Sequence, residues 1–180
     1  MLTKLILLVT LIFVFSSASL AQEDSEAKPS ELGLLKSYIG VWDATIKVWS
    51  AGLDSPPIEF TAVETNRAYG EHWIASDFDS EYMGQIVTVH SIVGYDLDQK
   101  KMVGTIIDHG PYSASMLGDY DDEAKTVTWI TKAKDVNGNP MTQRTLVTQT
   151  SPEERNLVLV VPGAEGEDYV KFMQIHFVKR

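Results

Sequence analysis

The sequence predicts an all-β protein: about ten antiparallel strands in an up-and-down barrel, preceded by one short helix. Residues 85–108 give the clearest observation, because two runs rich in valine and isoleucine flank a polar break at residues 96–101. Such a pattern is typical of a β-hairpin. Weaker copies recur on both sides, which indicates a meander, and closure into a barrel removes its exposed edges. A jelly-roll sandwich is the alternative architecture.

The first 21 residues have the features of a secretory signal peptide. Lys4 precedes an apolar run at residues 5–15, and a stretch of small residues follows. Ser19 and Ala21 occupy the small-residue positions before a cleavage site, so we expect the mature chain to begin at Gln22. The apolar run is shorter than the roughly 20 residues of a membrane-spanning helix. We therefore expect export, to a periplasm or by secretion, with an uncleaved N-terminal anchor as the alternative.

The remaining chain divides into a loose polar leader at residues 22–29 and a single β-barrel domain at residues 30–180. The sequence has no cysteine, which excludes disulfides and thiolate metal sites. Its formal net charge is -10, and an acidic body repels phosphate backbones and anionic lipid headgroups. We therefore expect neither nucleic acid nor, after signal cleavage, a membrane surface as a partner. The sequence does not indicate an oligomeric state.

One helix is predicted at the front of the domain. Ser30 is a suitable N-cap, and Leu32, Leu35 and Tyr38 follow at helical spacing before Gly40. The apolar stripe of so short a helix must cover another element, and the open end of a barrel would suit it.

Alternation of apolar and polar residues between turn residues predicts the strands. In the first of them, Trp42, Ala44 and Ile46 share one face, and a strong turn signal lies at residues 135–140. The expected strands are 41–49, 58–67, 71–79, two within 85–108, 112–120, 125–132, 141–150, 156–161 and 168–178.

Short blocks spread along the chain form a recognisable pattern. They are Glu64–Arg67, Met83–Gln85, Gly94–Asp96, Lys100–Thr105, Ile107–Asp108 and Tyr120–Asp121. Together with Gly40-Val41-Trp42, which is similar to the opening of lipocalin-like barrels, they resemble a bacterial family catalogued as domain of unknown function 1579. The resemblance runs from about Leu32 to the C-terminus. It implies a calycin-type, lipocalin-like β-barrel and no activity, and the chain departs from the family pattern at His176.

Polar residues on otherwise apolar strand faces are candidate ligand-binding residues. Glu64 and Asn66 alternate with apolar residues on the second predicted strand, and Asp108 does so on the fifth. Trp73 would add an aromatic wall. Ligand pockets are mostly apolar with a few placed polar groups, and an inward carboxylate needs a partner such as Arg67. The alternative is that these residues lie near strand ends in contact with water.

His176 is the last candidate ligand-binding residue. It shares a strand face with Phe172, Gln174 and Val178, which favours a position inside the barrel. Haem-binding β-barrels of the nitrobindin type carry an iron-ligating histidine on a late strand, and this arrangement resembles theirs. Haem is therefore the only cofactor considered, and no other is expected. The alternative is a hydrogen-bonded or exposed histidine.

No metal site and no catalytic residue is predicted. Asp77, Asp79 and Glu81 alternate along one strand and could attract a hard cation, although a solvated acidic face is the simpler interpretation. The turn at residues 135–140 begins like a calcium loop, but Pro140 stands where that loop needs glycine. No two histidines have the spacing of a zinc motif, and no Gly-x-Ser-x-Gly elbow occurs.

Three functions remain open at this point. The favoured one is an exported barrel that binds a small apolar or amphipathic molecule, with the five candidate residues in its lining. The second is a packed barrel that contacts other proteins through loops at residues 51–57 and 162–167. The third is an enzyme that uses a buried carboxylate, such as Asp108, as a general base.

Overall fold

The computed structural model describes residues 29–50, 52–82, 84–135, 137–162 and 169–180. The predicted signal peptide at residues 1–21 lies outside the described residues, as does the predicted leader apart from Pro29. Within the described ranges, no helix combines the length and the apolar character needed to cross a membrane.

The helix and all the strands that the sequence predicts are present, with bounds that differ by a few residues. The helix begins at Pro29, one residue before the predicted cap, in keeping with the tolerance of a first helical turn for proline. The elements are α1 (Pro29–Ser37), β1 (Gly40–Val48), β2 (Ile58–Tyr69), β3 (Trp73–Tyr82), β4 (Gln85–Asp96), β5 (Lys101–Ile107), β6 (Ser113–Asp121), β7 (Thr126–Lys134), β8 (Pro140–Ser151), β9 (Glu154–Val161) and β10 (Val170–Lys179).

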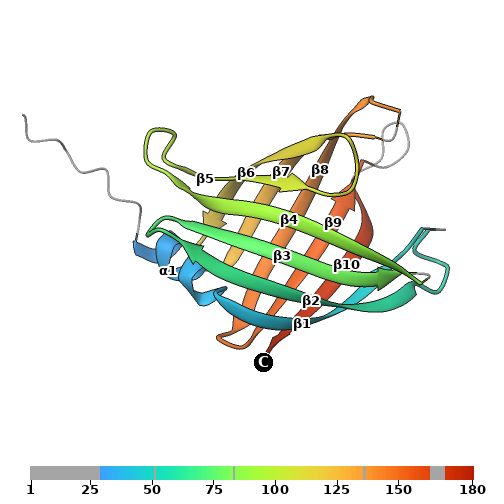
Figure 1. Ribbon diagram of the computed structural model, residues 1–180, viewed down its shortest axis with the longest axis horizontal. Helices are drawn as coiled ribbons and strands as arrows, with labels where there is room; N and C mark the ends of the chain where they lie inside the picture. The colour runs from blue at the N-terminus through green and yellow to red at the C-terminus, as the bar shows by residue number, and fades with distance from the viewer. Residues whose placement is uncertain (1–28, 51, 83, 136, 163–168) are drawn as a thin grey trace, which may run out of the picture.

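The strands form a closed antiparallel barrel (Figure 1). Each strand pairs with its neighbours in the sequence, and β1 closes the barrel by pairing with both β2 and β10. Closure leaves none of these strands with an unpaired edge. The predicted all-β, up-and-down barrel is therefore confirmed, and the jelly-roll alternative is wrong.

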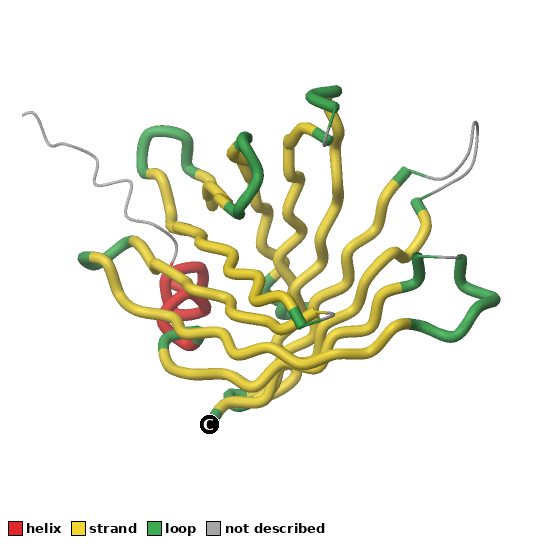
Figure 2. The backbone as a smooth tube through the Cα atoms, turned by 45° about the vertical axis from the view of Figure 1, so that its right-hand side comes forward, coloured by secondary structure: helices red, strands yellow, loops and turns green. Residues whose placement is uncertain are grey.

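The helix α1 closes one end of the barrel (Figure 2). Leu34, Leu35 and Tyr38 are buried and pack against Ile74 and Met102 from the barrel wall. Because successive strands run in opposite directions, the short connections β2–β3, β4–β5, β6–β7 and β8–β9 lie at this same end. The connections β1–β2, β3–β4, β5–β6, β7–β8 and β9–β10 lie at the opposite end. The helix thus makes the two ends of the barrel different.

Apolar side chains line the inside of the barrel in two clusters. One lies beneath α1, and the other joins β1, β2 and β10 around Trp42 and Phe177. Trp42 has no exposed surface, and Ala44 and Ile46 are buried on the same face, as the alternation predicts. Between the two clusters the side chains leave the space that forms the candidate site.

The turn predicted at residues 135–140 is confirmed. One carboxylate oxygen of Asp135 accepts hydrogen bonds from the backbone N–H groups of Asn137 and Asn139, each at 2.8 Å. Together with the side-chain amide of Asn139, these donors hold the pKa of Asp135 below its usual range. Backbone and side-chain donors within the turn thus satisfy this carboxylate.

Gly94 on β4 faces Trp73 on β3 so closely that no larger residue fits. A Cβ atom there would stand 2.3 Å from Cε3 of Trp73 and 2.5 Å from the carbonyl oxygen of His72. We expect Gly94→Ala to lower the free energy of unfolding by about 1–3 kcal/mol, measured by urea denaturation. Gly33→Ala in α1, where nothing lies within 4 Å, is the control and should be neutral or stabilising. Equal losses in both variants would contradict the prediction.

Candidate functional site

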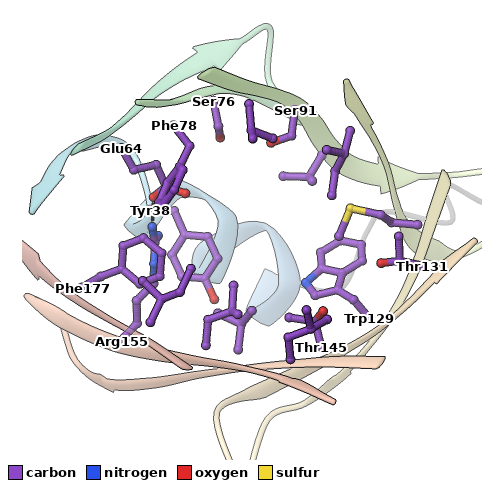
Figure 3. A pocket seen from close by; sticks show the side chains of 18 of the residues that line it. Tyr38, Glu64, Ser76, Phe78, Ser91, Trp129, Thr131, Thr145, Arg155 and Phe177 are labelled. Carbon is purple, nitrogen blue, oxygen red and sulfur yellow. Dashed lines mark ion pairs between the residues drawn. The ribbon is translucent and has the colours of Figure 1, made fainter. Parts of the chain in front are cut away.

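The interior of the barrel contains a cavity of about 310 Å³ (Figure 3). Its lining comes from Tyr38, which directly follows α1, and from every strand except β1. The apolar side chains are Ile74, Phe78, Val89, Val93, Ile106, Met116, Trp129, Val147, Leu157, Leu159, Met173, Ile175 and Phe177. The polar side chains are Tyr38, Glu64, Asn66, Ser76, Ser91, Thr131, Gln143, Thr145 and Arg155. The barrel is therefore hollow, which removes the premise of the packed-interior alternative.

A chain of polar contacts crosses the lining beside the helix. Arg155 on β9 forms an ion pair through Nη2 with Oε2 of Glu64 on β2. The same carboxylate oxygen accepts a hydrogen bond of 2.8 Å from the side-chain amide of Asn66. Ser76 on β3 donates in turn to the amide oxygen of Asn66. Arg155 and Asn66 stabilise the ionised carboxylate of Glu64, which disfavours it as a general base.

Aromatic rings enclose the guanidinium of Arg155. Its Cζ lies 4.5 Å from the ring centroid of Tyr38, 4.4 Å from that of Trp42 and 4.3 Å from that of Phe177. Only 3% of Arg155 is exposed, and its burial lowers the pKa of the guanidinium to about 10. Arg155 therefore remains charged at neutral pH. Its charge is stabilised by ring faces on several sides and by Glu64.

Tyr38 directly follows the helix and is fixed by its backbone. Its carbonyl oxygen accepts hydrogen bonds from the indole N–H of Trp42 at 2.8 Å and from the side-chain amide of Asn66 at 3.0 Å. The phenol extends into the cavity (Figure 3). Its hydroxyl is buried and has no hydrogen-bond partner among the described residues. Burial raises the pKa of Tyr38 to about 12, so the hydroxyl keeps its proton.

A second polar region faces this cluster across the cavity. Thr131 on β7 and Thr145 on β8 lie beside Trp129, as Figure 3 shows. Both threonines are buried. The strand pairing places Trp129 opposite Thr145 and Thr131 opposite Gln143. The cavity therefore has polar groups on two opposite sides, with Ser91 and apolar side chains between them.

Two of the five predicted site residues lie in the cavity lining, and they are in contact. Glu64 and Asn66 point inward from β2, on the face that also carries Phe60 and Ala62. Their alternation with apolar residues predicts this position correctly. Whether they bind a ligand stays a prediction.

Trp73 does not line the barrel cavity. On β3, the buried Ile74 and Ser76 face inward, so Trp73 faces the other side. There it covers Gly94 and lines a separate pocket of about 230 Å³ between α1 and the β2–β3 turn. The expected position of Trp73 in the barrel lining is therefore wrong. Neighbouring residues of a strand point to opposite faces, so a difference of one residue changes the face.

Asp108 and His176 also lie outside the cavity lining. The strand β5 ends at Ile107, so Asp108 is in an exposed loop, where it accepts a hydrogen bond from the backbone N–H of Gly110 at 2.7 Å. His176 faces outward from β10 because Ile175 and Phe177 occupy the inner face. Its Nδ1 lies 3.1 Å from the amide oxygen of Asn156. Asp108 is therefore not a buried base, and the expected inward position of His176 is wrong.

Sequence analysis missed two residues that shape the site, Arg155 and Tyr38. Arg155 alternates with Leu157 and Leu159 on β9, and this pattern could have indicated an inward cation, although not its partner. Tyr38 was expected only as part of the apolar stripe of the helix. Its position at the barrel axis depends on how the helix docks, which the helical spacing does not specify.

The acidic face of β3 is occupied by protein partners. Asp77 forms an ion pair with Arg67 and accepts a hydrogen bond of 2.7 Å from Nδ1 of His90. The His90 and Arg67 contacts hold the pKa of Asp77 below its usual range. Asp79 accepts a hydrogen bond of 2.7 Å from Thr88. In the described part of the chain, no group of three histidine or carboxylate side chains is arranged to hold a metal ion.

Comparison with known proteins agrees with this architecture. Residues 29–179 match the family described as protein of unknown function (DUF1579), and the chain belongs to this family. None of the curated proteins matches the chain.

Two solved structures are similar in shape. The crystal structure of Rv2717c from M. tuberculosis is 8% identical with a TM-score of 0.63, and the match covers 86% of this chain and 99% of that chain. A redesigned β-barrel is 10% identical with a TM-score of 0.45, and that match also covers 86% of this chain and 99% of the other. The likeness to Rv2717c supports the barrel fold and nothing beyond it.

Proposed function

We propose that this DUF1579 barrel binds a small, largely apolar molecule inside its cavity. The observation that carries the proposal is the hollow interior of about 310 Å³, lined mainly by apolar side chains with a few polar groups. Small-molecule sites in proteins typically combine an apolar wall with a few placed polar groups in a space of about 300–1,000 Å³. The cavity has this composition and lies at the lower limit of this size.

The cavity volume limits the size of the ligand. One water molecule occupies about 30 Å³ in the liquid, so the cavity offers room for about ten non-hydrogen atoms. An apolar molecule of that size gains free energy from leaving water, about 25 cal/mol for each Å² of apolar surface buried. A medium-length alkyl chain or a compact ring system suits the space.

We also propose that the ligand is met outside the cytoplasm. This rests on the secretory features of residues 1–21, which lie outside the described part of the chain. Native mass spectrometry of the protein purified gently from its own host tests both proposals in one measurement. A polypeptide mass that corresponds to a chain beginning at Gln22 supports export. A co-purifying mass that is lost on denaturation supports ligand binding.

A filled cavity should no longer bind an apolar probe. Ser91 on β4 lines the cavity, whereas the next residue, Ile92, is exposed on the outer face of the same strand. We expect Ser91→Phe to weaken binding of a fluorescent naphthylamine probe by about tenfold or more, because the new ring occupies the ligand's space.

The matched variant Ile92→Phe adds the same ring outside the barrel and should bind the probe like the wild type. Thermal unfolding of both variants establishes that the barrel is intact. Equal probe binding by wild type and Ser91→Phe, with both folded, would place the binding site elsewhere.

A further inference from the structure

We propose that the ligand carries one neutral oxygen group, such as a carbonyl or an alcohol, and that this group forms a hydrogen bond with the hydroxyl of Tyr38. The proposal rests on the proposed function, since it assumes that the cavity holds a ligand. It specifies the chemical class of the ligand, because it favours ketones, aldehydes, esters and alcohols over carboxylic acids.

The first step is the unpaired hydroxyl of Tyr38. It is buried, points into the cavity and has no hydrogen-bond partner among the described residues (Figure 3). Buried polar groups nearly always have a partner, because leaving one unpaired is costly. An oxygen group on a ligand in the cavity would supply the missing partner.

The second step is the protonation of this hydroxyl. Because burial raises the pKa of Tyr38 to about 12, the phenol is neutral and can donate its proton under physiological conditions. Its aromatic ring lies against the guanidinium of Arg155, with Cζ 4.5 Å from the ring centroid, so the ring cannot turn away without losing that contact. The donor is thus held in place before a ligand arrives.

The third step is the charge of the site. Arg155 is the cation of the lining, and Glu64 already compensates it in an ion pair. The rings of Tyr38, Trp42 and Phe177 lie around the same guanidinium. A ligand carboxylate would place a second negative charge beside Glu64 without a free cation, and an uncompensated buried charge is strongly unfavourable. A neutral oxygen has no such cost.

Three probes of similar size separate these possibilities: methyl heptyl ketone, octanoate and decane. Each has about ten non-hydrogen atoms, as the cavity volume suggests. Their affinities are measured by displacement of the fluorescent naphthylamine probe from the full-length mature protein. We expect the ketone to bind more tightly than octanoate to the wild type.

Tyr38→Phe removes the hydroxyl and keeps the ring. We expect it to weaken binding of the ketone about two- to tenfold, which corresponds to the loss of one neutral hydrogen bond. Binding of decane should not change. Because the hydroxyl lacks a partner among the described residues, the thermal stability of the unliganded variant should not fall. Tyr120→Phe is the matched control, since Tyr120 is not among the residues that line the cavity and its hydroxyl contacts Asp122 at 3.1 Å. This variant should bind all three probes like the wild type.

Glu64→Gln tests the charge argument separately. It removes the negative charge that compensates Arg155, so the affinity for octanoate should rise while that for decane stays the same. The proposal is overturned if Tyr38→Phe leaves the affinity for the ketone unchanged, or if it lowers the affinity for decane by the same factor. It is also overturned if octanoate binds the wild type as tightly as the ketone does. If decane itself fails to displace the probe from the wild type, the proposed function fails as well, so the two failures are distinguishable.

Discussion

Replacing Glu64 with alanine is expected to lower the free energy of unfolding by about 3–5 kcal/mol. The substitution leaves the guanidinium of Arg155 inside the barrel without its counter-charge, at a position that is only 3% exposed. The amide of Asn66 also loses one acceptor, although it keeps its hydrogen bond to the carbonyl oxygen of Tyr38.

A second ion pair on the same strand provides the control. Glu59 on β2 pairs with Lys47 at 3.2 Å, and both side chains are about half exposed. Glu59→Ala should change the free energy of unfolding by less than about 1 kcal/mol, because water screens the exposed pair. Urea denaturation of both variants gives the comparison. Similar losses for Glu59→Ala and Glu64→Ala would show that burial does not control the strength of these pairs.

Removing both partners should be less harmful than removing Glu64 alone. The double variant Arg155→Met and Glu64→Leu replaces the ion pair with apolar side chains of similar length, and such exchanges are often nearly neutral. It would also remove the cation from the aromatic rings around it, so we expect its stability to lie between those of Glu64→Ala and the wild type. This order separates the cost of an unpaired charge from the value of the pair itself.

The strand pattern of the barrel could be predicted because each strand obeys local rules. On β1, Trp42, Ala44 and Ile46 alternate with polar residues, and only one of the two faces is apolar enough to be buried. The turn at Asp135 contains its own hydrogen-bond donors and acceptors. Information of this kind lies within a few neighbouring residues, so the sequence alone is sufficient.

The faces of β10 could not be predicted in the same way. Both of them are apolar, since Phe172 and Val178 lie on one side and Ile175 and Phe177 on the other. The first pair is partly exposed, and a shift in pairing register between Lys171 and Met173 interrupts the alternation. Periodicity therefore could not decide the direction of His176, because that direction depends on how the barrel closes.

The ion pair of the candidate site was beyond prediction for a related reason. Glu64 is on β2 and Arg155 on β9, and β1 and β10 separate these strands in the barrel. The long side chain of Arg155 reaches across them through the interior. Glu64 alone was recognisable from its apolar neighbours, whereas its partner depends on the tertiary structure.

Replacing Trp42 with alanine should have an effect as large as that of Glu64→Ala. Trp42 has no exposed surface and packs with Ile46, Ile175 and Phe177 in the cluster around β1. Removing a buried aromatic side chain typically lowers the free energy of unfolding by about 3–5 kcal/mol. The variant also removes one of the rings around Arg155 and the hydrogen bond of 2.8 Å to the carbonyl oxygen of Tyr38.

Two further variants separate these contributions in urea denaturation. Trp42→Phe keeps a ring and loses the hydrogen bond, so it should cost less than Trp42→Ala, although its smaller ring also leaves some space unfilled. Trp49→Ala, just after the same strand, removes a partly buried ring whose centroid lies 4.1 Å from Nζ of Lys171, and it should cost less than Trp42→Ala. If Trp49→Ala were as destabilising as Trp42→Ala, burial on the inner face of β1 would not explain the role of Trp42. If Trp42→Phe also weakened ketone binding without affecting decane, the hydrogen bond to Tyr38 would be what holds the phenol in position for its ligand.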